Sequence, residues 1–142
     1  MNSDDLVSPK KLILYVEDEE FQAKLFARII ENEVKDRGLQ VIIFNNGADF
    51  IDLVNSRNKN YKIEQFGIIL LDLAMFDFSG IAMLKEAQDK NIKTPIAILS
   101  AREDEALKKQ SFDLGAKDYF VKGKDLLELE RLRKFIIDNT QY

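Results

Sequence analysis

The sequence has no cysteine, no histidine and no tryptophan, and only two prolines among its 142 residues. Without cysteine, the chain forms neither disulfides nor thiolate metal sites. Without histidine, it lacks the commonest general base in proteins and the commonest ligand of transition metals. Any chemistry that the chain performs must therefore come from carboxylates, hydroxyls and amines.

The sequence also has no long apolar run and no excess of positive charge. No apolar stretch approaches the ~20 residues that a membrane span needs, and residues 1–10 carry acidic residues but no apolar segment like that of a signal peptide. The net charge of −4 offers no basic patch for nucleic acid. We therefore expect a cytoplasmic protein that binds neither a membrane nor a nucleic acid.

The chain does contain enough apolar residues for one domain. Hydrophobic residues make up 46% of the sequence, which is typical of a globular protein, and 142 residues suffice for one core. Residues 1–10 are interpreted as an N-terminal tail and residues 11–142 as the domain. No linker follows the last predicted helix, so we expect no second domain.

Five short apolar runs alternate with longer amphipathic segments. The runs are residues 12–16, 41–44, 68–71, 96–99 and 119–121. The segments interpreted as helices are residues 19–37, 48–57, 80–90, 103–114 and 124–138. The first helix places one apolar stripe at Phe21, Leu25, Ile29 and Ile30. Continuous apolar runs indicate strands covered on both faces, and strict strand–helix alternation predicts an α/β fold with a doubly wound parallel sheet.

Polar side chains follow or end four of the predicted strands. Glu17 and Asp18 follow the first strand, Asp72 the third, Ser100 the fourth and Lys122 the fifth. Because the carboxyl ends of parallel strands lie on one edge of a sheet, these side chains should converge in the crevice where open α/β sheets bind ligands. Three acids, a hydroxyl and a lysine suit a phosphoryl group and a hard divalent cation such as Mg2+.

Each of these side chains also has a purely structural interpretation. The acids of residues 17–20 can serve a helix N-terminus, where the dipole favours negative charge. Asp72 can be a turn residue and Lys122 a solvated lysine, and Ser100 with Glu103 matches a capping box. Their convergence favours a site, because two carboxylates ~4 Å apart repel by about 4 kcal/mol at an effective dielectric near 20 unless a cation intervenes.

Asp72 is the candidate for covalent chemistry. A carboxylate can attack phosphorus and form an acyl phosphate, and Lys122 can supply a point charge to the phosphoryl oxygens. A phosphohydrolase of the haloacid-dehalogenase type is an alternative, but it needs a second acid where Ala74 stands. A flavodoxin-like cofactor carrier is another, but it needs a Ser/Thr/Gly-rich phosphate loop in place of the acidic residues 17–20.

Four segments in this order resemble the receiver domain of two-component response regulators. They are LILYVEDEE, LLDLAMFDFSG, PIAILSA and GAKDYFVKG, which run from residue 12 to residue 123. The resemblance implies a flavodoxin-like fold of five βα units with strand order 2-1-3-4-5. It also implies that residues 11–142 form a receiver domain, which is a phosphoacceptor switch rather than an enzyme.

The resemblance implies a role for each candidate residue. Asp72 would accept a phosphoryl group from a histidine kinase or a histidine phosphotransfer protein. Ser100 and Lys122 would contact that phosphoryl group. Mg2+ would be held by Asp18, Asp72 and the carbonyl of Ala74, with Glu17 supporting the metal through water.

The resemblance also implies a conformational switch. Tyr119 matches the aromatic residue that changes rotamer when the hydroxyl of Ser100 is drawn inward. We expect the signal to pass through the face formed by helix 103–114, strand 119–121 and helix 124–138. A downstream protein partner or a second copy of the chain would bind there.

The chain departs from the family pattern at two loop positions. Phe76 and Gly123 stand where the family usually has prolines, the second of them after a cis peptide bond. Neither change removes a catalytic group, and we expect a trans peptide before Gly123 and an unusual φ at that glycine. Two alternatives remain: a receiver segment of a larger hybrid kinase, and a protein-binding module that is not phosphorylated.

Overall fold

The computed structural model describes residues 11–140, so the tail predicted for residues 1–10 lies outside the described part of the chain. Each of the five predicted strands is confirmed to within two residues. They are β1 (Leu12–Val16), β2 (Gln40–Phe44), β3 (Phe66–Leu71), β4 (Ile96–Ser100) and β5 (Asp118–Val121). All strand pairs are parallel and the order is β2-β1-β3-β4-β5, which confirms the expected 2-1-3-4-5 arrangement.

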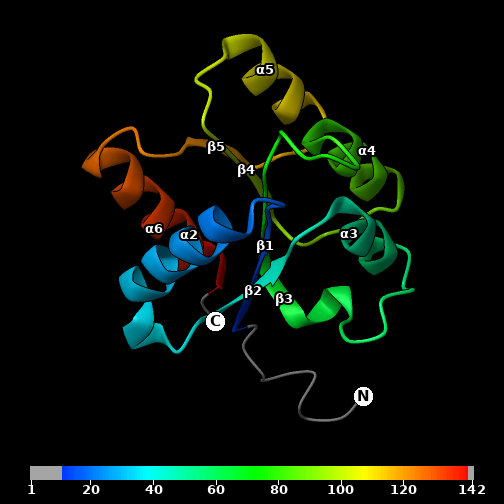
Figure 1. The fold of residues 1–142 in the computed structure, drawn as a ribbon, viewed down its shortest axis with the longest axis horizontal. Helices are drawn as coiled ribbons and strands as arrows, with labels where there is room; N and C mark the ends of the chain where they lie inside the picture. The colour runs from blue at the N-terminus through cyan, green and yellow to red at the C-terminus, as the bar shows by residue number, and fades with distance from the viewer. Residues whose placement is uncertain (1–10, 141–142) are drawn as a thin grey trace.

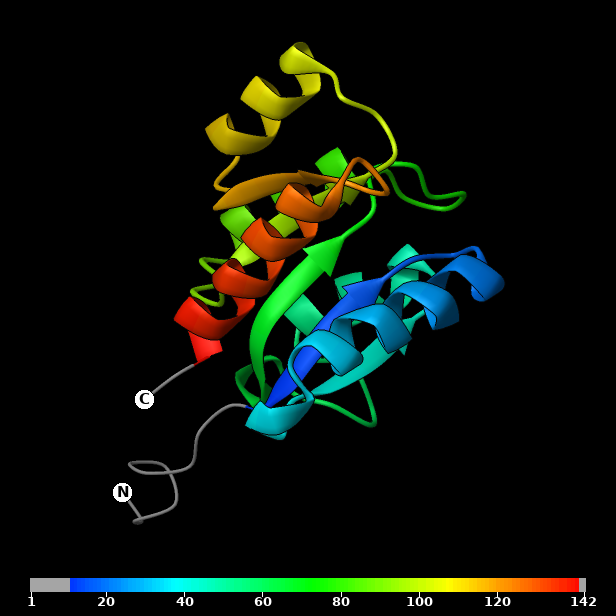
Figure 2. The same ribbon diagram turned by 90° about the vertical axis from the view of Figure 1, so that its left-hand side faces the viewer.

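Helices cover both faces of this sheet. They are α2 (Glu20–Glu33), α3 (Gly47–Val54), α4 (Gly80–Asp89), α5 (Glu105–Asp113) and α6 (Leu126–Thr140), with short 3-10 turns at Lys35–Arg37 and Ile63–Gln65. Helices α2 and α6 lie on one face, and α3, α4 and α5 lie on the other (Figure 1, Figure 2). The doubly wound fold class is therefore confirmed. Within residues 11–140, no helix has the length and apolar character that a membrane crossing requires.

The central strand β3 joins the two halves of the core. All six of its residues are buried. Ile68 and Leu70 belong to the apolar cluster under α2 and α6, whereas Ile69 and Leu71 belong to the cluster under the other three helices. Successive strand residues point to opposite faces, and burying each such side chain is worth about 1.5–3 kcal/mol. This packing fixes the position of Asp72, the next residue.

The apolar stripe predicted for the first helix is only partly correct. Ile30 is buried, but Phe21 and Leu25 are 73% and 51% exposed. The buried face of α2 consists of Ala23, Ala27 and Ile30, which follow the i, i+4, i+7 spacing of one helix face. The small alanines let the helix backbone approach the sheet, and Phe21 and Leu25 lie outside that contact.

The start of the helix after β4 also differs from the prediction. Helix α5 begins at Glu105, and the capping residue is Asp104, whose Oδ1 accepts hydrogen bonds from two N–H groups of the first turn at 3.0 and 3.1 Å. The capping box proposed for Ser100 and Glu103 is therefore wrong. Ser100 is the last residue of β4, and the aspartate next to the helix provides the cap instead.

Asp77, in the loop between β3 and α4, ties that loop to the start of α3. Its Oδ1 accepts a hydrogen bond from the Gly47 N–H at 2.8 Å, and its Oδ2 accepts one from the Ala48 N–H at 2.9 Å. The Phe78 N–H donates a third bond to Oδ1. Slight burial acts in the opposite direction, but these backbone donors hold the pKa of Asp77 below its ordinary value.

We expect Asp77→Ala to lower the free energy of unfolding by about 1 kcal/mol at pH 7, because the N–H groups at the start of α3 lose their acceptor. The folded-state pKa is lowered, so this contribution is present above the unfolded-state pKa and is lost as the pH falls through the folded-state value. The difference between wild type and variant should therefore close below the ordinary value of 3.8.

Urea unfolding between pH 3 and pH 7 measures this difference. Asp89→Ala is the matched control, because Asp89 is exposed and its carboxylate lies at the long distance of 3.9 Å from the Lys85 ammonium. A stability loss in Asp77→Ala that is the same at both ends of the pH range would show that the carboxylate charge of Asp77 is not what stabilises the loop.

Candidate functional site

Three predicted site residues meet at the carboxyl edge of the sheet. The Lys122 ammonium lies 2.7 Å from Glu17 Oε1 and 2.7 Å from Asp72 Oδ2. These partners are 105 and 50 positions away in the sequence. The fold therefore brings together one lysine and two acids that the order of the strands placed on one edge.

Backbone hydrogen bonds of the sheet position each of these three residues. The N–H of Glu17 donates to Phe44, that of Asp72 to Val16 and that of Lys122 to Ser100, all at 2.7–3.1 Å. Each functional residue is thus the first residue beyond its strand, and its backbone is still held by the neighbouring strand. This geometry explains why side chains from distant segments converge without support from a loop.

The site carries more negative than positive charge. Glu17 and Asp72 are 2% and 7% exposed, and both are paired with the one ammonium of Lys122. Burial and the neighbouring Asp72 carboxylate raise the pKa of Glu17 to about 7, against the effect of Lys122. Burial also disfavours the Lys122 ammonium, but the ionised form of Tyr15 and the two carboxylates outweigh it and hold the pKa of Lys122 above its ordinary value.

The loop after Asp72 folds back tightly over its own backbone. Asp72 Oδ1 accepts a hydrogen bond from the Ala74 N–H at 2.8 Å. Gly80, the first residue of α4, lies so close that an added Cβ would be 2.6 Å from the Asp72 carbonyl oxygen. Phe76 is 99% exposed. A glycine is therefore required at position 80 for α4 to begin beside the buried carboxylate.

The carboxylate of Asp18 points to this loop rather than joining the other two acids. Its Oδ2 accepts a hydrogen bond from the Phe76 N–H at 2.7 Å. Within residues 11–140, no group of three metal-ligating side chains is arranged to hold an ion. In this structure the three acids are thus not arranged as a metal cluster, since Lys122 pairs with Glu17 and Asp72 and the Asp18 carboxylate is bonded to the loop.

The two expected switch residues, Ser100 and Tyr119, both form hydrogen bonds with the backbone of Arg102. Ser100 is buried, and its Oγ accepts a hydrogen bond from the Arg102 N–H at 3.1 Å. Tyr119 is also buried, and its hydroxyl donates to the Arg102 carbonyl at 2.7 Å. The segment after β4 therefore connects Ser100 to Tyr119.

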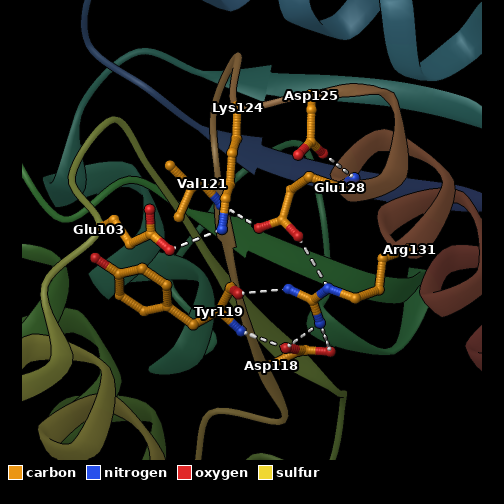
Figure 3. A network of polar contacts seen from close by, with 8 residues as sticks. All are labelled: Glu103, Asp118, Tyr119, Val121, Lys124, Asp125, Glu128 and Arg131. Carbon is orange, nitrogen blue, oxygen red and sulfur yellow. Dashed lines mark hydrogen bonds and ion pairs between the residues drawn. The ribbon is translucent and has the colours of Figure 1, made fainter.

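A polar network covers the outer edge of β5, where the predicted signalling face lies (Figure 3). Arg131 donates to both carboxylate oxygens of Asp118 and to the Tyr119 carbonyl, all at 2.8 Å. Its Nε also donates to Glu128 at 3.0 Å, and Glu128 accepts a bond from the Val121 N–H at 2.8 Å. Side chains of α6 therefore occupy polar backbone groups of this edge strand.

Gly123 follows the lysine in the conformation expected for it. No peptide bond is cis within residues 11–140, and Gly123 has a φ of +67°.

Tyr15 was not singled out from the sequence, yet its ring lies 5.8 Å from the Lys122 ammonium. No local signal indicates this contact, because Tyr15 reads as one more buried residue of an apolar strand.

The chain is similar to known proteins over nearly its whole length. The family model of the response regulator receiver domain matches residues 13–134. Among curated proteins, the transcriptional regulatory protein YkoG of Bacillus subtilis, itself named uncharacterized, is 30% identical over 128 residues, which are 89% of this chain and 51% of YkoG. CiaR of Streptococcus pneumoniae is 36% identical over 100 residues, 67% of this chain and 45% of CiaR.

Solved structures agree with this match. The receiver domain of the Francisella response regulator 1452 has a TM-score of 0.68 at 25% identity, covering 94% of this chain and all of that one. The Mn2+-bound form of the response regulator Rcp1 has a TM-score of 0.69 at 25% identity, covering 89% and 91%. The chain spans about half the length of the curated relatives it matches. By its family match, its strand order and its relatives, the chain belongs to the response regulator receiver domains.

Proposed function

We propose that Asp72 accepts a phosphoryl group from a histidine kinase or a histidine phosphotransfer protein. The observation that carries this proposal is the Lys122 ammonium, 2.7 Å from both Asp72 and Glu17 at the carboxyl edge of the sheet. In the transfer, a carboxylate oxygen of Asp72 forms a bond to phosphorus while the bond from phosphorus to the donor's imidazole nitrogen breaks. The electron pair of the broken bond stays on that nitrogen, which then takes a proton.

The residues around Asp72 supply charge and position for this transfer. Lys122 is already in contact with Asp72, so it needs only to move one N–H from a carboxylate oxygen to a phosphoryl oxygen. The hydroxyl of Ser100, at the end of the strand between β3 and β5, is the second group that we assign to the phosphoryl oxygens. Binding by positioned donors of this kind is the main source of catalysis in phosphoryl transfer.

We further propose that Mg2+ binds to Asp18, Asp72 and the Ala74 carbonyl, with Glu17 acting through water. The chemistry of the donor set fits, because carboxylate and carbonyl oxygens are the ligands that Mg2+ prefers. Two buried carboxylates here share one lysine, and the Asp18 carboxylate is bonded to the loop beside them. Rcp1, a structural neighbour, is described in its Mn2+-bound form. When bound, the ion neutralises negative charge on the transferring phosphoryl oxygens.

The signal would leave through α5, β5 and α6, which we call the signalling face. Ser100 and Tyr119 meet at the Arg102 backbone, so a shift of the Ser100 hydroxyl toward a phosphoryl group would reach Tyr119 through one residue. Leu126 and Leu127 on α6 are each 80% exposed. A downstream protein or a second copy of the chain would bind this face.

The names of the relatives raise the question of whether this domain contacts nucleic acid. YkoG and CiaR are named transcriptional regulatory proteins, whereas this chain has a net charge of −4. We propose that the domain described here works in the cytoplasm without contacting nucleic acid itself. Its role in a longer chain, including a hybrid kinase, would be the same transfer to Asp72.

The first prediction concerns the phosphoacceptor. Asp72→Asn should abolish phosphorylation by acetyl phosphate with Mg2+, because an amide does not attack phosphorus. Intact mass spectrometry measures the gain of one phosphoryl group. Asp77→Asn makes the same carboxylate-to-amide change at another residue of this loop, and this variant should still be phosphorylated. Equal gain by wild type and Asp72→Asn would refute the assignment, and no gain by wild type would favour a protein-binding module that is not phosphorylated.

The second prediction concerns the metal. Lys122→Ala leaves two buried carboxylates without a counter-charge, so the metal-free protein should lose about 3 kcal/mol of unfolding free energy. Mg2+ should stabilise this variant more than wild type, because it neutralises the same carboxylates. Lys124→Ala, which removes an exposed lysine paired with Glu103, serves as the control and should respond as wild type does. Melting curves with and without Mg2+ that show equal shifts for all three proteins would contradict the metal assignment.

The third prediction concerns the switch. Tyr119→Phe removes the hydroxyl that donates to the Arg102 carbonyl. We expect Asp72 to be phosphorylated as in wild type, while the phosphorylation-dependent change in amide hydrogen exchange over residues 101–121 becomes smaller. Hydrogen exchange with mass spectrometry measures both states. Unchanged protection of wild type on phosphorylation would count against a switch at this face.

A further inference from the structure

Tyr15 is the only side chain within residues 11–140 that has a fully buried polar atom without a hydrogen-bond partner. It lies in β1, is 0% exposed and packs on Phe26 with ring centroids 5.9 Å apart. The Lys122 ammonium lies 5.8 Å from the centroid of its ring. The unpaired hydroxyl therefore belongs to the neighbourhood of the proposed phosphoryl site, although none of the functions above uses it.

We propose that Tyr15 is a positioning residue that holds the Lys122 ammonium in place for the phosphoryl group, an inference that rests on the proposed function of Asp72. Its ring forms part of the wall beside the ammonium. Its hydroxyl offers a neutral acceptor to an N–H of Lys122 when the lysine turns from the carboxylates to the phosphoryl oxygens.

The energetics indicate that the hydroxyl does not serve the stability of this state. A buried hydroxyl without a partner costs about 1–3 kcal/mol, and phenylalanine would fill the same ring volume without that cost. Burial raises the pKa of Tyr15, and the nearby Lys122 charge opposes that rise. The phenol therefore stays neutral at pH 7 and acts as a hydrogen-bonding group rather than a base.

The third N–H of the Lys122 ammonium is the donor that the Tyr15 hydroxyl can accept. An ammonium has three N–H donors, and Glu17 and Asp72 accept two of them at 2.7 Å each. A third carboxylate would hold the ammonium back from the phosphoryl group. A neutral hydroxyl forms a weaker bond than an ionised group does, so it orients Lys122 without competing with the phosphoryl oxygens.

The test compares Tyr15→Phe, Lys122→Ala and the double variant with wild type. Tyr61→Phe is the matched control, because Tyr61 packs between Phe44 and Phe66 with centroid distances of 6.1 and 5.6 Å. For each protein, NMR titrations measure the affinity for beryllofluoride at saturating Mg2+ and the affinity for Mg2+ alone. The melting temperature is measured without metal. The exchange rate of the Lys122 ammonium protons is measured in the beryllofluoride complexes of the proteins that retain this lysine.

We expect Tyr15→Phe to bind beryllofluoride about 3- to 10-fold more weakly, which is the effect of one hydrogen bond. In the beryllofluoride complex, its Lys122 ammonium protons should exchange with water faster than those of wild type. Its Mg2+ affinity should stay within about twofold of wild type, and its melting temperature should be equal or higher, because the unpaired hydroxyl is gone. The double variant should match Lys122→Ala, and Tyr61→Phe should match wild type.

Different failures identify different errors. Wild-type beryllofluoride affinity and ammonium exchange in Tyr15→Phe would overturn the positioning role and leave the proposed function of Asp72 intact. An equal loss with and without Lys122 would also overturn it, because Tyr15 would then act on the fold rather than through the lysine. A wild-type protein that binds no beryllofluoride would overturn the proposed function itself.

Discussion

The position of the Lys122 ammonium between two buried carboxylates is the constraint on which the rest of the site depends. Breaking a buried ion pair by removing one partner costs about 3–5 kcal/mol, so β1, β3 and β5 must end at matching heights. Because β4 lies between β3 and β5, the cation has to reach past the end of a whole strand. The long, flexible stem of lysine makes that reach possible.

The loop between β3 and α4 is held from two directions although it lacks the proline expected of the family at position 76. Asp77 joins it to α3 through the N–H groups of Gly47 and Ala48, and Asp18, two residues beyond β1, accepts a hydrogen bond from the Phe76 N–H. Hydrogen bonds to the carboxylates of Asp77 and Asp18 restrict the conformation of this loop, as the fixed φ of a proline would. An ion that recruits Asp18 would have to exchange this bond for metal coordination.

The sequence was sufficient for the strands and for the residues at their ends, because continuous apolar runs and their polar ends are local patterns. The strand order was expected only from the resemblance to receiver domains. It was insufficient where a contact is decided by packing at long range. Phe21 and Leu25 fit an apolar stripe, but alanines form the buried face of α2. Asp77 acts on residues about 30 positions away, and Tyr15 is indistinguishable in sequence from any buried strand residue.

The outer edge of β5 has a consequence for the choice of partners. A free strand edge accepts almost any extended peptide, because it offers main-chain donors and acceptors that carry no sequence information. Here the Tyr119 carbonyl and the Val121 N–H are already bonded to Arg131 and Glu128. A visiting peptide would meet side-chain charges instead of open backbone groups, so discrimination among related binding proteins at this face must come from their own charge pattern.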